Sequence, residues 1–267
     1  MISRRELPRV HAEFNATWGA PYGYSSLKSK LLERVALFIG STHMLARARG
    51  PFGFQPDNNA TRIAEYPWAF YAVPVLPGHR VVDVGGSLGG FQFVLSKQGA
   101  EVINVDPSDA ASMGWPVDQR TIDLLNKAFR TRVELRKSFL SEAGIKERSI
   151  DRIYCISTIE HIPPNQISDL LREMRRILKP GGMAILTIDL FFDLQPFTDL
   201  EVNVHGTNID VRQLVEESGM SLAQGNRSEL YGYPEFDPKA VQARAMEFFQ
   251  GNIAVNVAQT LVLRRDS

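Results

Sequence analysis

A cluster of glycines between two acidic residues is the part of this sequence best suited to hold a ligand. Asp83 lies in the apolar run 80–84, the glycine-rich stretch 85–90 follows at once, and Asp106 ends the next apolar run. Glycine lets a backbone approach a ligand closely, and the first N–H groups of a following helix are free to bind it. The two acids stand 23 positions apart, about the spacing of a nucleoside-binding fingerprint, in which the second acid accepts both ribose hydroxyls. These residues therefore predict a site for a nucleoside cofactor.

The order of the glycines narrows the kind of cofactor. A dinucleotide-binding turn places three glycines as G-x-G-x-x-G after a strand that carries no acid. Here Asp83, Gly85, Ser87 and Gly89 stand at alternate positions. An acidic strand end attracts a cationic ligand more strongly than a pyrophosphate. The pattern therefore favours a positively charged nucleoside.

Strands and helices alternate from about residue 78 onward, and they must position this site. The short apolar runs expected to be strands are 80–84, 101–105, 133–135, 151–157, 183–188 and 257–263. The segments with helical periodicity are 24–39, 91–97, 121–129, 166–178 and 210–218. This alternation predicts an α/β fold with a doubly wound, mostly parallel sheet and ligands at the carboxyl ends of its strands. We expect a helical N-terminal extension or lid over residues 1–70 and one domain over 71–267.

The chain resembles the class I S-adenosylmethionine-dependent methyltransferases, whose first motif is (Asp/Glu)-x-Gly-x-Gly-x-Gly. The resemblance covers residues 78–190 well and 190–267 loosely, and its further marks are the segments 104–106, 151–162 and 178–182. Ser87 stands where the family has its middle glycine, and a residue this small should still let the chain turn. The resemblance implies S-adenosylmethionine as the cofactor and a Rossmann-like, seven-stranded sheet with an antiparallel last strand.

The resemblance also implies roles for individual residues toward the cofactor. The positions expected to bind it are Asp83, Gly85, Gly86, Ser87, Gly89, Asp106, Ser138, Phe139, Ser157 and Thr158. The glycine turn would line the methionine part, and Asp106 would hold the ribose hydroxyls. Ser138 and Phe139 stand where the family often has an adenine-binding acid, so a hydroxyl, backbone groups and ring stacking would replace it. Ser157 and Thr158 would border the sulfonium and the acceptor.

His161 and Glu160 are the candidate catalytic residues. Methyl transfer to a hydroxyl requires the removal of a proton, and histidine titrates near neutral pH. His161 follows the fourth strand on the rim where the acceptor should lie, and Glu160 beside it could orient the ring or raise its basicity. The alternative is a structural role, because Glu-His-Ile is a frequent ending of this strand in the family.

A metal site is a further interpretation of the same pair. Small-RNA 2′-O-methyltransferases bind a metal through Glu-x-x-Glu-His and a later histidine, and Ser157 replaces the first acid here. His205 with Asp189 or Asp193 could complete an oxygen- and nitrogen-rich site. Our expectation is a site without metal.

Three other segments allow two interpretations each. The stretch 62–68 could cover the cofactor as a lid, or Tyr66 and Trp68 could pack in the core. The aromatic segments 189–197 and 231–236 could wall an acceptor pocket or cover the edge of the sheet. The single cysteine, Cys155, lies in an apolar run, which indicates a buried and inert thiol.

Composition bounds the class of partner. Thirty basic and thirty acidic residues give a net charge of zero, which indicates no nucleic-acid or membrane partner. The first 50 residues hold eight Lys and Arg against three acids, a basic arm for an anionic substrate or a solvated helix face. No apolar stretch is long enough for a membrane span or a signal peptide, so the cytoplasm is the expected compartment.

The expected function is methylation of a small molecule, most readily at oxygen, in a sugar, glycan or secondary-metabolite pathway. One alternative is a non-catalytic or regulatory protein that keeps the fold and the cofactor. A nucleic-acid methyltransferase is the other, and the absence of an Asn/Asp-Pro-Pro-Tyr/Phe motif weighs against it. The acceptor and the oligomeric state stay open.

Overall fold

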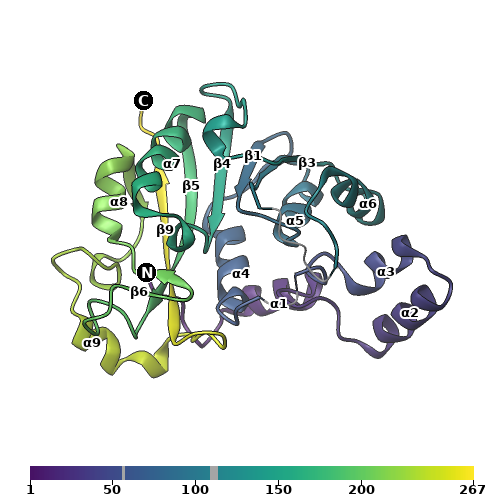
Figure 1. Cartoon of the computed structure of the whole chain (residues 1–267), viewed down its shortest axis with the longest axis horizontal. Coiled ribbons are helices and arrows are strands. Elements are labelled where there is room, and N and C mark those ends of the chain that lie inside the picture. The colour runs from purple at the N-terminus through teal and green to yellow at the C-terminus, as the bar shows by residue number, and fades with distance from the viewer. Residues whose placement is uncertain (56–57, 109–113) are drawn as a thin grey trace.

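A seven-stranded sheet forms the centre of the computed structural model, which describes residues 1–55, 58–108 and 114–267 (Figure 1). The strands follow the order β3-β2-β1-β4-β5-β9-β8. Their bounds are β1 Arg80–Val84, β2 Glu101–Val105, β3 Val133–Arg136, β4 Ile150–Ile156, β5 Leu178–Phe191, β8 Ser221–Gln224 and β9 Asn256–Arg264. Only β9 runs antiparallel to its neighbours β5 and β8, and the other pairs in this sheet are parallel. The doubly wound sheet with an antiparallel last strand is confirmed.

The strands around the glycine turn begin and end where the sequence predicts. β1, β2 and helix α5 have the expected bounds. β5 is longer than the predicted 183–188 because it pairs with β9 continuously from Met183 to Phe191. β8 was not predicted, since its four residues are half-exposed or exposed and carry no apolar run. A hairpin of two very short strands, β6 Val202–Asn203 and β7 Gly206–Thr207, lies apart from the sheet.

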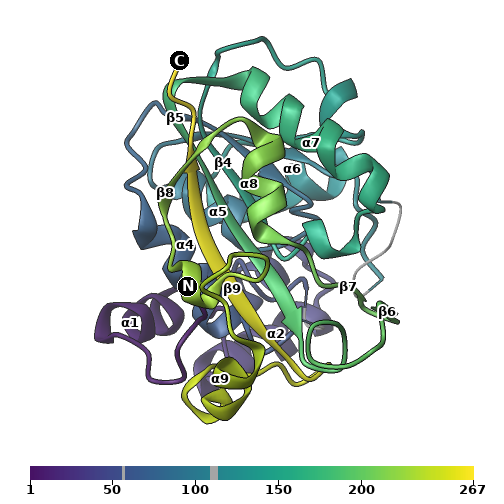
Figure 2. The same cartoon turned by 90° about the vertical axis from the view of Figure 1, so that its left-hand side faces the viewer.

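Helices cover both faces of the sheet, as Figure 2 shows. Their bounds are α1 Arg9–Trp18, α2 Leu27–Phe38, α3 Thr42–Arg49, α4 Arg62–Ala72, α5 Phe91–Lys97, α6 Gln119–Phe129, α7 Pro164–Ile177, α8 Val211–Ser218 and α9 Pro238–Ala243. One buried cluster joins α7 and α8 to one face of the sheet, and a second joins α4, α5 and α6 to the other. The result is a three-layer α/β/α arrangement.

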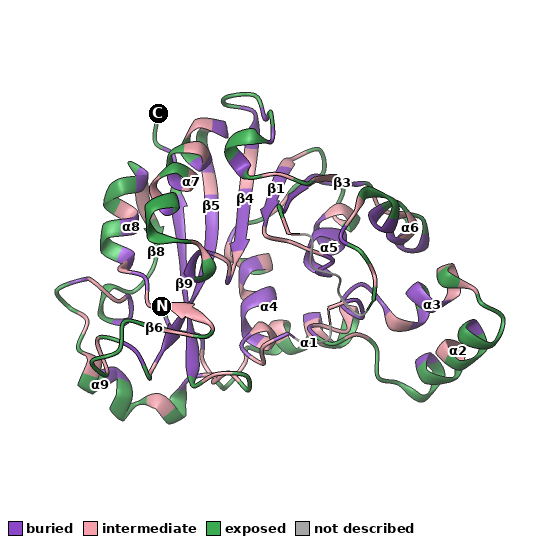
Figure 3. Ribbon diagram, in the orientation of Figure 1, coloured by how far each residue is buried: buried purple, intermediate pink, exposed green. Residues whose placement is uncertain are grey.

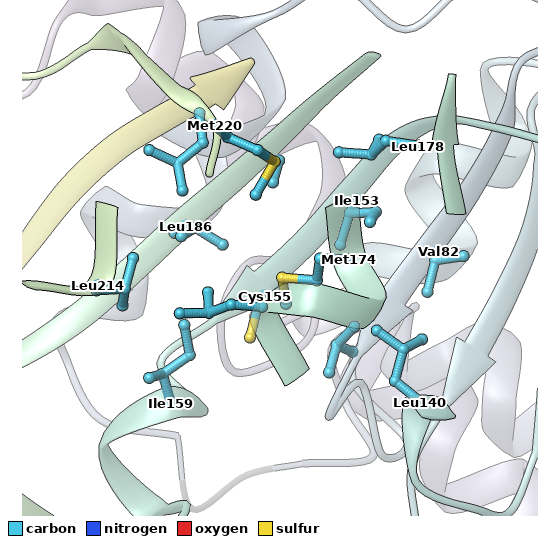
Figure 4. Close-up of a cluster of buried hydrophobic side chains, with 14 of the residues drawn as sticks. Val82, Leu140, Ile153, Cys155, Ile159, Met174, Leu178, Leu186, Leu214 and Met220 are labelled. Atoms are coloured by element: carbon cyan, nitrogen blue, oxygen red, sulfur yellow. The ribbon is translucent and has the colours of Figure 1, made fainter. Parts of the chain in front are cut away.

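The first of these clusters surrounds Cys155 (Figure 4). Ile153, Met174, Leu186 and Leu214 are at most 2% exposed and belong to the same core. Cys155 is fully buried among them, and burial raises the pKa of its thiol. The expectation of a buried thiol is confirmed.

The N-terminal segment shares its core with the sheet domain. Phe14, Phe52 and Phe54 are buried in the cluster that also contains α5 and α6. The chain begins beside β9, where Ile2 pairs with Gln259. Within the ranges described above, no helix is long and apolar enough to cross a membrane.

Candidate functional site

The glycine turn after β1 has positive φ angles and close backbone contacts that favour small residues. Gly85 has φ of 72°, and a Cβ there would lie 2.5 Å from the Thr158 side chain. A Cβ on Gly86 would lie 2.7 Å from Oδ2 of Asp83. Ser87 has φ of 45°, so the serine adopts the left-handed conformation itself. The turn therefore forms as expected, packed closely between the ends of β1 and β4.

Two buried carboxyl groups flank this turn. Burial, and then the charge of Asp106, raise the pKa of Asp83 to about 7. Asp106 accepts hydrogen bonds from the backbone N–H of Ser87 and of Ser108, each at 2.8 Å. Each carboxylate oxygen has two lone pairs, so both retain acceptor capacity for a ligand hydroxyl. The acids predicted from their spacing are thus brought together at the carboxyl ends of β1 and β2.

A cavity of about 770 Å³ runs along the carboxyl ends of the strands to the start of α7. A smaller hollow of about 60 Å³ lies against the glycine turn. The predicted residues that line one or both are Asp83, Gly85, Gly86, Gly89, Asp106, Ser138, Phe139, Ser157, Thr158 and His161. Ser87 lines neither, and its backbone instead bonds Asp106.

The far end of the large cavity offers a flat apolar surface and an unused hydroxyl. Phe139 is 54% exposed, although it is a large apolar side chain. Oγ of Ser138 is buried without a hydrogen-bond partner. Buried polar atoms are normally paired, so an unpaired one on a cavity wall indicates a place for a ligand atom. A ring that stacks on Phe139 and bonds Ser138 would fit this end.

An arginine from α4 forms the opposite wall, and sequence analysis did not single it out. Arg62 lines both hollows and pairs with Glu65, with Nη1 and Oε2 2.7 Å apart. Nη1 of Arg62 also donates to Oγ of Ser157 at 2.5 Å. Glu65 is fully buried and also accepts from Thr187 at 2.8 Å. The stretch 62–68 thus has both expected roles. Arg62 lines the cavity, and Tyr66 packs in the core against Phe91.

Two more buried acids lie behind this ion pair. Oγ of Ser157 is 3.5 Å from Oδ1 of Asp189, and Oε1 of Glu160 accepts from the Asp189 N–H at 3.1 Å. Burial, and then the charge of Glu65, raise the pKa of Asp189 to about 7. Burial and Asp189 raise the pKa of Glu160 well above its usual range, and its Oε2 has no partner. Asp189 and Glu160 therefore bind protons more readily than ordinary carboxyl groups, beside the Arg62–Glu65 ion pair.

Ser157 connects this acidic cluster to the cavity. It has φ of 39°, and its side chain is among the groups that line both hollows. A residue other than glycine in the left-handed region is uncommon and is often found at functional sites. Ser157 is thus the contact between the cavity and the acids.

His161 and Glu160 do not form the pair that their sequence positions suggest. His161 is exposed at the cavity wall in a short 3₁₀ turn, Ile159–His161. Glu160 points the other way, to the Asp189 backbone, so it does not orient the imidazole. Partial burial lowers the pKa of His161 rather than raising it. The pKa of His161 is thus not raised as expected, because Glu160 bonds the Asp189 backbone and desolvation acts on the imidazole.

The aromatic segments after β5 and α8 pack against each other. Phe192 and Phe197 have ring centroids 4.8 Å apart, and Tyr231 and Phe236 5.7 Å apart. These rings are partly buried, pack against the buried cluster around Ile2 and line neither hollow. They therefore pack beside β5 and β9 and do not line the cavity described above.

Some residues of the metal interpretation lie near one another, as His161 and His205 do, but others have different partners. Asp193 accepts two hydrogen bonds from Asn203, and the His205 ring stacks on Phe191 at 6.4 Å. In the part of the chain that the structure describes, no three His, Cys, Asp or Glu residues are placed to hold a metal ion.

Comparisons with known proteins agree with this geometry. Residues 82–186 match the family model described as a methyltransferase domain. An uncharacterized methyltransferase of Mycobacteroides abscessus is 30% identical over 48% of this chain and 46% of its own length. A ubiquinone biosynthesis O-methyltransferase of Hahella chejuensis is 29% identical over 44% of this chain and 43% of its own length. The chain thus spans about half the length of these curated relatives.

The fold comparison covers more of the molecule. The crystal structure of the [4+2]-cyclase SpnF superposes with a TM-score of 0.54 at 13% identity, over 91% of this chain and 98% of that one. At this identity the likeness shows the shared fold. The methyltransferase match lies on β1 to β5 and includes the glycine turn, Asp83, Asp106 and most of the residues that line the cavity. Residues 82–186 are thus similar to a methyltransferase domain, and the chain as a whole has the fold of SpnF.

Proposed function

We propose that this protein transfers the methyl group of S-adenosylmethionine to an oxygen atom of a small-molecule acceptor. The observation that carries the proposal is the single cavity onto which Asp106, Ser138, Phe139 and Ser157 converge. Asp106 suits a ribose, and Ser138 with Phe139 suits an adenine ring. Ser157 lies where the cationic amino-acid part would follow. The relative from Hahella chejuensis, by its name an O-methyltransferase, supports oxygen as the acceptor atom.

The residues present fit the cofactor at three points. Asp106 retains lone pairs for the ribose hydroxyls, and the unpaired Ser138 hydroxyl with the Phe139 ring suits adenine. Asp83 in the small hollow suits a cation, and Arg62 beside it suits a carboxylate. When bound, the cofactor supplies an electrophilic methyl group on a sulfonium. The protein must then align an acceptor oxygen behind that methyl and remove its proton.

Two groups on the wall near Ser157 and Thr158 could take that proton. The first is His161, which has a lowered pKa and is therefore neutral at pH 7, the form that accepts a proton. The second is Asp189, which Ser157 links to the cavity. We place His161 first because its side chain is exposed at the cavity wall, whereas Asp189 is buried behind Ser157.

The test is turnover of methyl-labelled S-adenosylmethionine with pools of small hydroxylated metabolites, with Asp106→Ala as the binding-deficient control. Label transferred to an alkali-stable, oxygen-linked product supports the proposal. Cofactor binding without transfer to any pool would favour a non-catalytic protein of this fold. Transfer to nitrogen or carbon would contradict oxygen as the acceptor atom.

The role of His161 is tested on the acceptor found in that way. His161→Ala should lower kcat by roughly 10²–10⁴-fold with cofactor affinity nearly unchanged. His161→Gln keeps much of the side-chain volume and serves as the packing control. If both variants lose melting temperature but keep the rate per folded molecule, the residue is structural.

A further inference from the structure

Helix α2 presents an apolar stripe that no other part of the described chain covers. The sequence predicts an amphipathic helix here, and α2 forms over Leu27–Phe38. Its apolar side, however, faces solvent. The exposed fractions are 88% for Leu27, 65% for Leu31, 42% for Val35 and 92% for Phe38. These four side chains follow one another at steps of three and four residues, so they form one stripe along the helix.

The opposite side of α2 accounts for its place in the fold. Ser29 and Ala36 are the buried residues of this helix. They lie roughly half a turn away from the stripe, on the side toward α3, with which α2 forms a helical hairpin. Figures 1 and 3 show α2 at the periphery, with its outward surface exposed. The stripe therefore lies on the side of α2 that faces away from α3.

Cations flank the stripe on both sides. Lys28, Lys30 and Arg34 are exposed. The only acid of the helix, Glu33, is half-buried and pairs with Arg49 of α3 at 2.8 Å. The outward surface thus combines large apolar side chains with positive charge and no free acid. This is the composition of helices that lie in the headgroup region of a bilayer.

A second copy of the chain fits this surface less well. A two-fold contact would place the same patch against itself. Lys28, Lys30 and Arg34 would then face the same three cations, and like charges repel. A bilayer that contains anionic lipids offers the complementary charge and an apolar interior together.

We propose that α2 is a membrane-surface helix that binds bilayers containing anionic lipids. Leu27, Leu31, Val35 and Phe38 enter the boundary between headgroups and acyl chains, and the flanking cations contact lipid phosphates. The helix lies in the plane of the surface and does not span it. This proposal is independent of the proposed methyl transfer, because none of these residues lines the cofactor cavity.

The test is cosedimentation of the full chain with vesicles of phosphatidylcholine, with or without an equal part of phosphatidylglycerol. We expect binding to the anionic vesicles that weakens as salt is raised, and little binding to the neutral ones. Leu31→Ser with Phe38→Ser should reduce binding by about tenfold or more. Lys28→Gln with Arg34→Gln should reduce it by about thirtyfold.

The matched control removes exposed apolar side chains elsewhere. Val204 is 94% exposed and Met246 70% exposed, outside α2, so Val204→Ser with Met246→Ser should leave vesicle binding unchanged. All substituted side chains are exposed, and thermal melting and cofactor affinity should match the parent protein. Failure to bind anionic vesicles, or equal binding to neutral ones, would overturn the proposal. A dimer that dissociates when Leu31 and Phe38 are substituted would also overturn it. That result would show that the stripe contacts a second copy of the chain.

Discussion

Asp83 should couple cofactor binding to pH. Burial beside Asp106 raises its pKa to about 7 from an ordinary value of 3.8. A bound cation in the adjoining hollow favours the carboxylate, so below pH 7 binding must expel a proton from Asp83. Affinity for S-adenosylmethionine therefore rises with pH up to 7, gains about a further twofold above pH 7 and then levels off. If the cation restores the ordinary pKa, the gain between about pH 5.5 and 7 is about fifteenfold.

Isothermal titration calorimetry across this range gives both the affinity and, from two buffers of different ionisation enthalpy, the number of protons released. The α-amino group of the ligand stays protonated below about pH 7.7, so its own titration does not enter. Asp83→Asn should bind with a flat pH profile. Asp189→Asn controls for the second buried acid with a similarly raised pKa. Release of the same number of protons by wild type and Asp83→Asn would refute this reasoning.

Three further outcomes follow from the same contacts. Asp106→Ala should weaken cofactor binding by about 1.5–3 kcal/mol, the loss of hydrogen bonds to a charged acceptor, and unchanged affinity by calorimetry would remove the ribose assignment. Phe139→Ala should weaken S-adenosylmethionine and S-adenosylhomocysteine equally, by about 0.5–1.5 kcal/mol, since both carry adenine; a selective effect on one ligand would contradict stacking. The raised pKa of Asp189 means that the folded state loses stability as pH rises from about 4 to 7. Asp189→Asn should therefore melt higher than wild type at about pH 8, with the difference shrinking toward about pH 5, and a constant difference would contradict it.

The nucleoside half of the site could be predicted because its residues lie in short contiguous motifs. Gly85, Asp106 and Ser157 each follow directly on a strand, and parallel strands bring their carboxyl ends to one edge. The local sequence therefore predicts both the strand and the position of the functional group at its end.

The acidic cluster could not be predicted in this way. Glu65, Glu160 and Asp189 come from three elements that meet only because β4 lies beside β5 and α4 packs across their ends. No local pattern encodes that meeting. In the same way, the periodicity of α2 gave an apolar face but not what the face would contact, because that depends on the final placement of the helix.

The residues around the cavity come from two parts of the chain, the range matched by the family model and its flanks. The matched domain, residues 82–186, supplies the groups expected to hold the nucleoside, whereas Arg62 and Glu65 precede it and Asp189 follows it. Arg62, Glu65 and Asp189 are thus encoded outside the range that the family model matches. Substitutions in these flanks can alter the chemistry offered to an acceptor while the nucleoside contacts stay intact. Chimeras that exchange only these flanks between relatives would test whether the flanks select the acceptor.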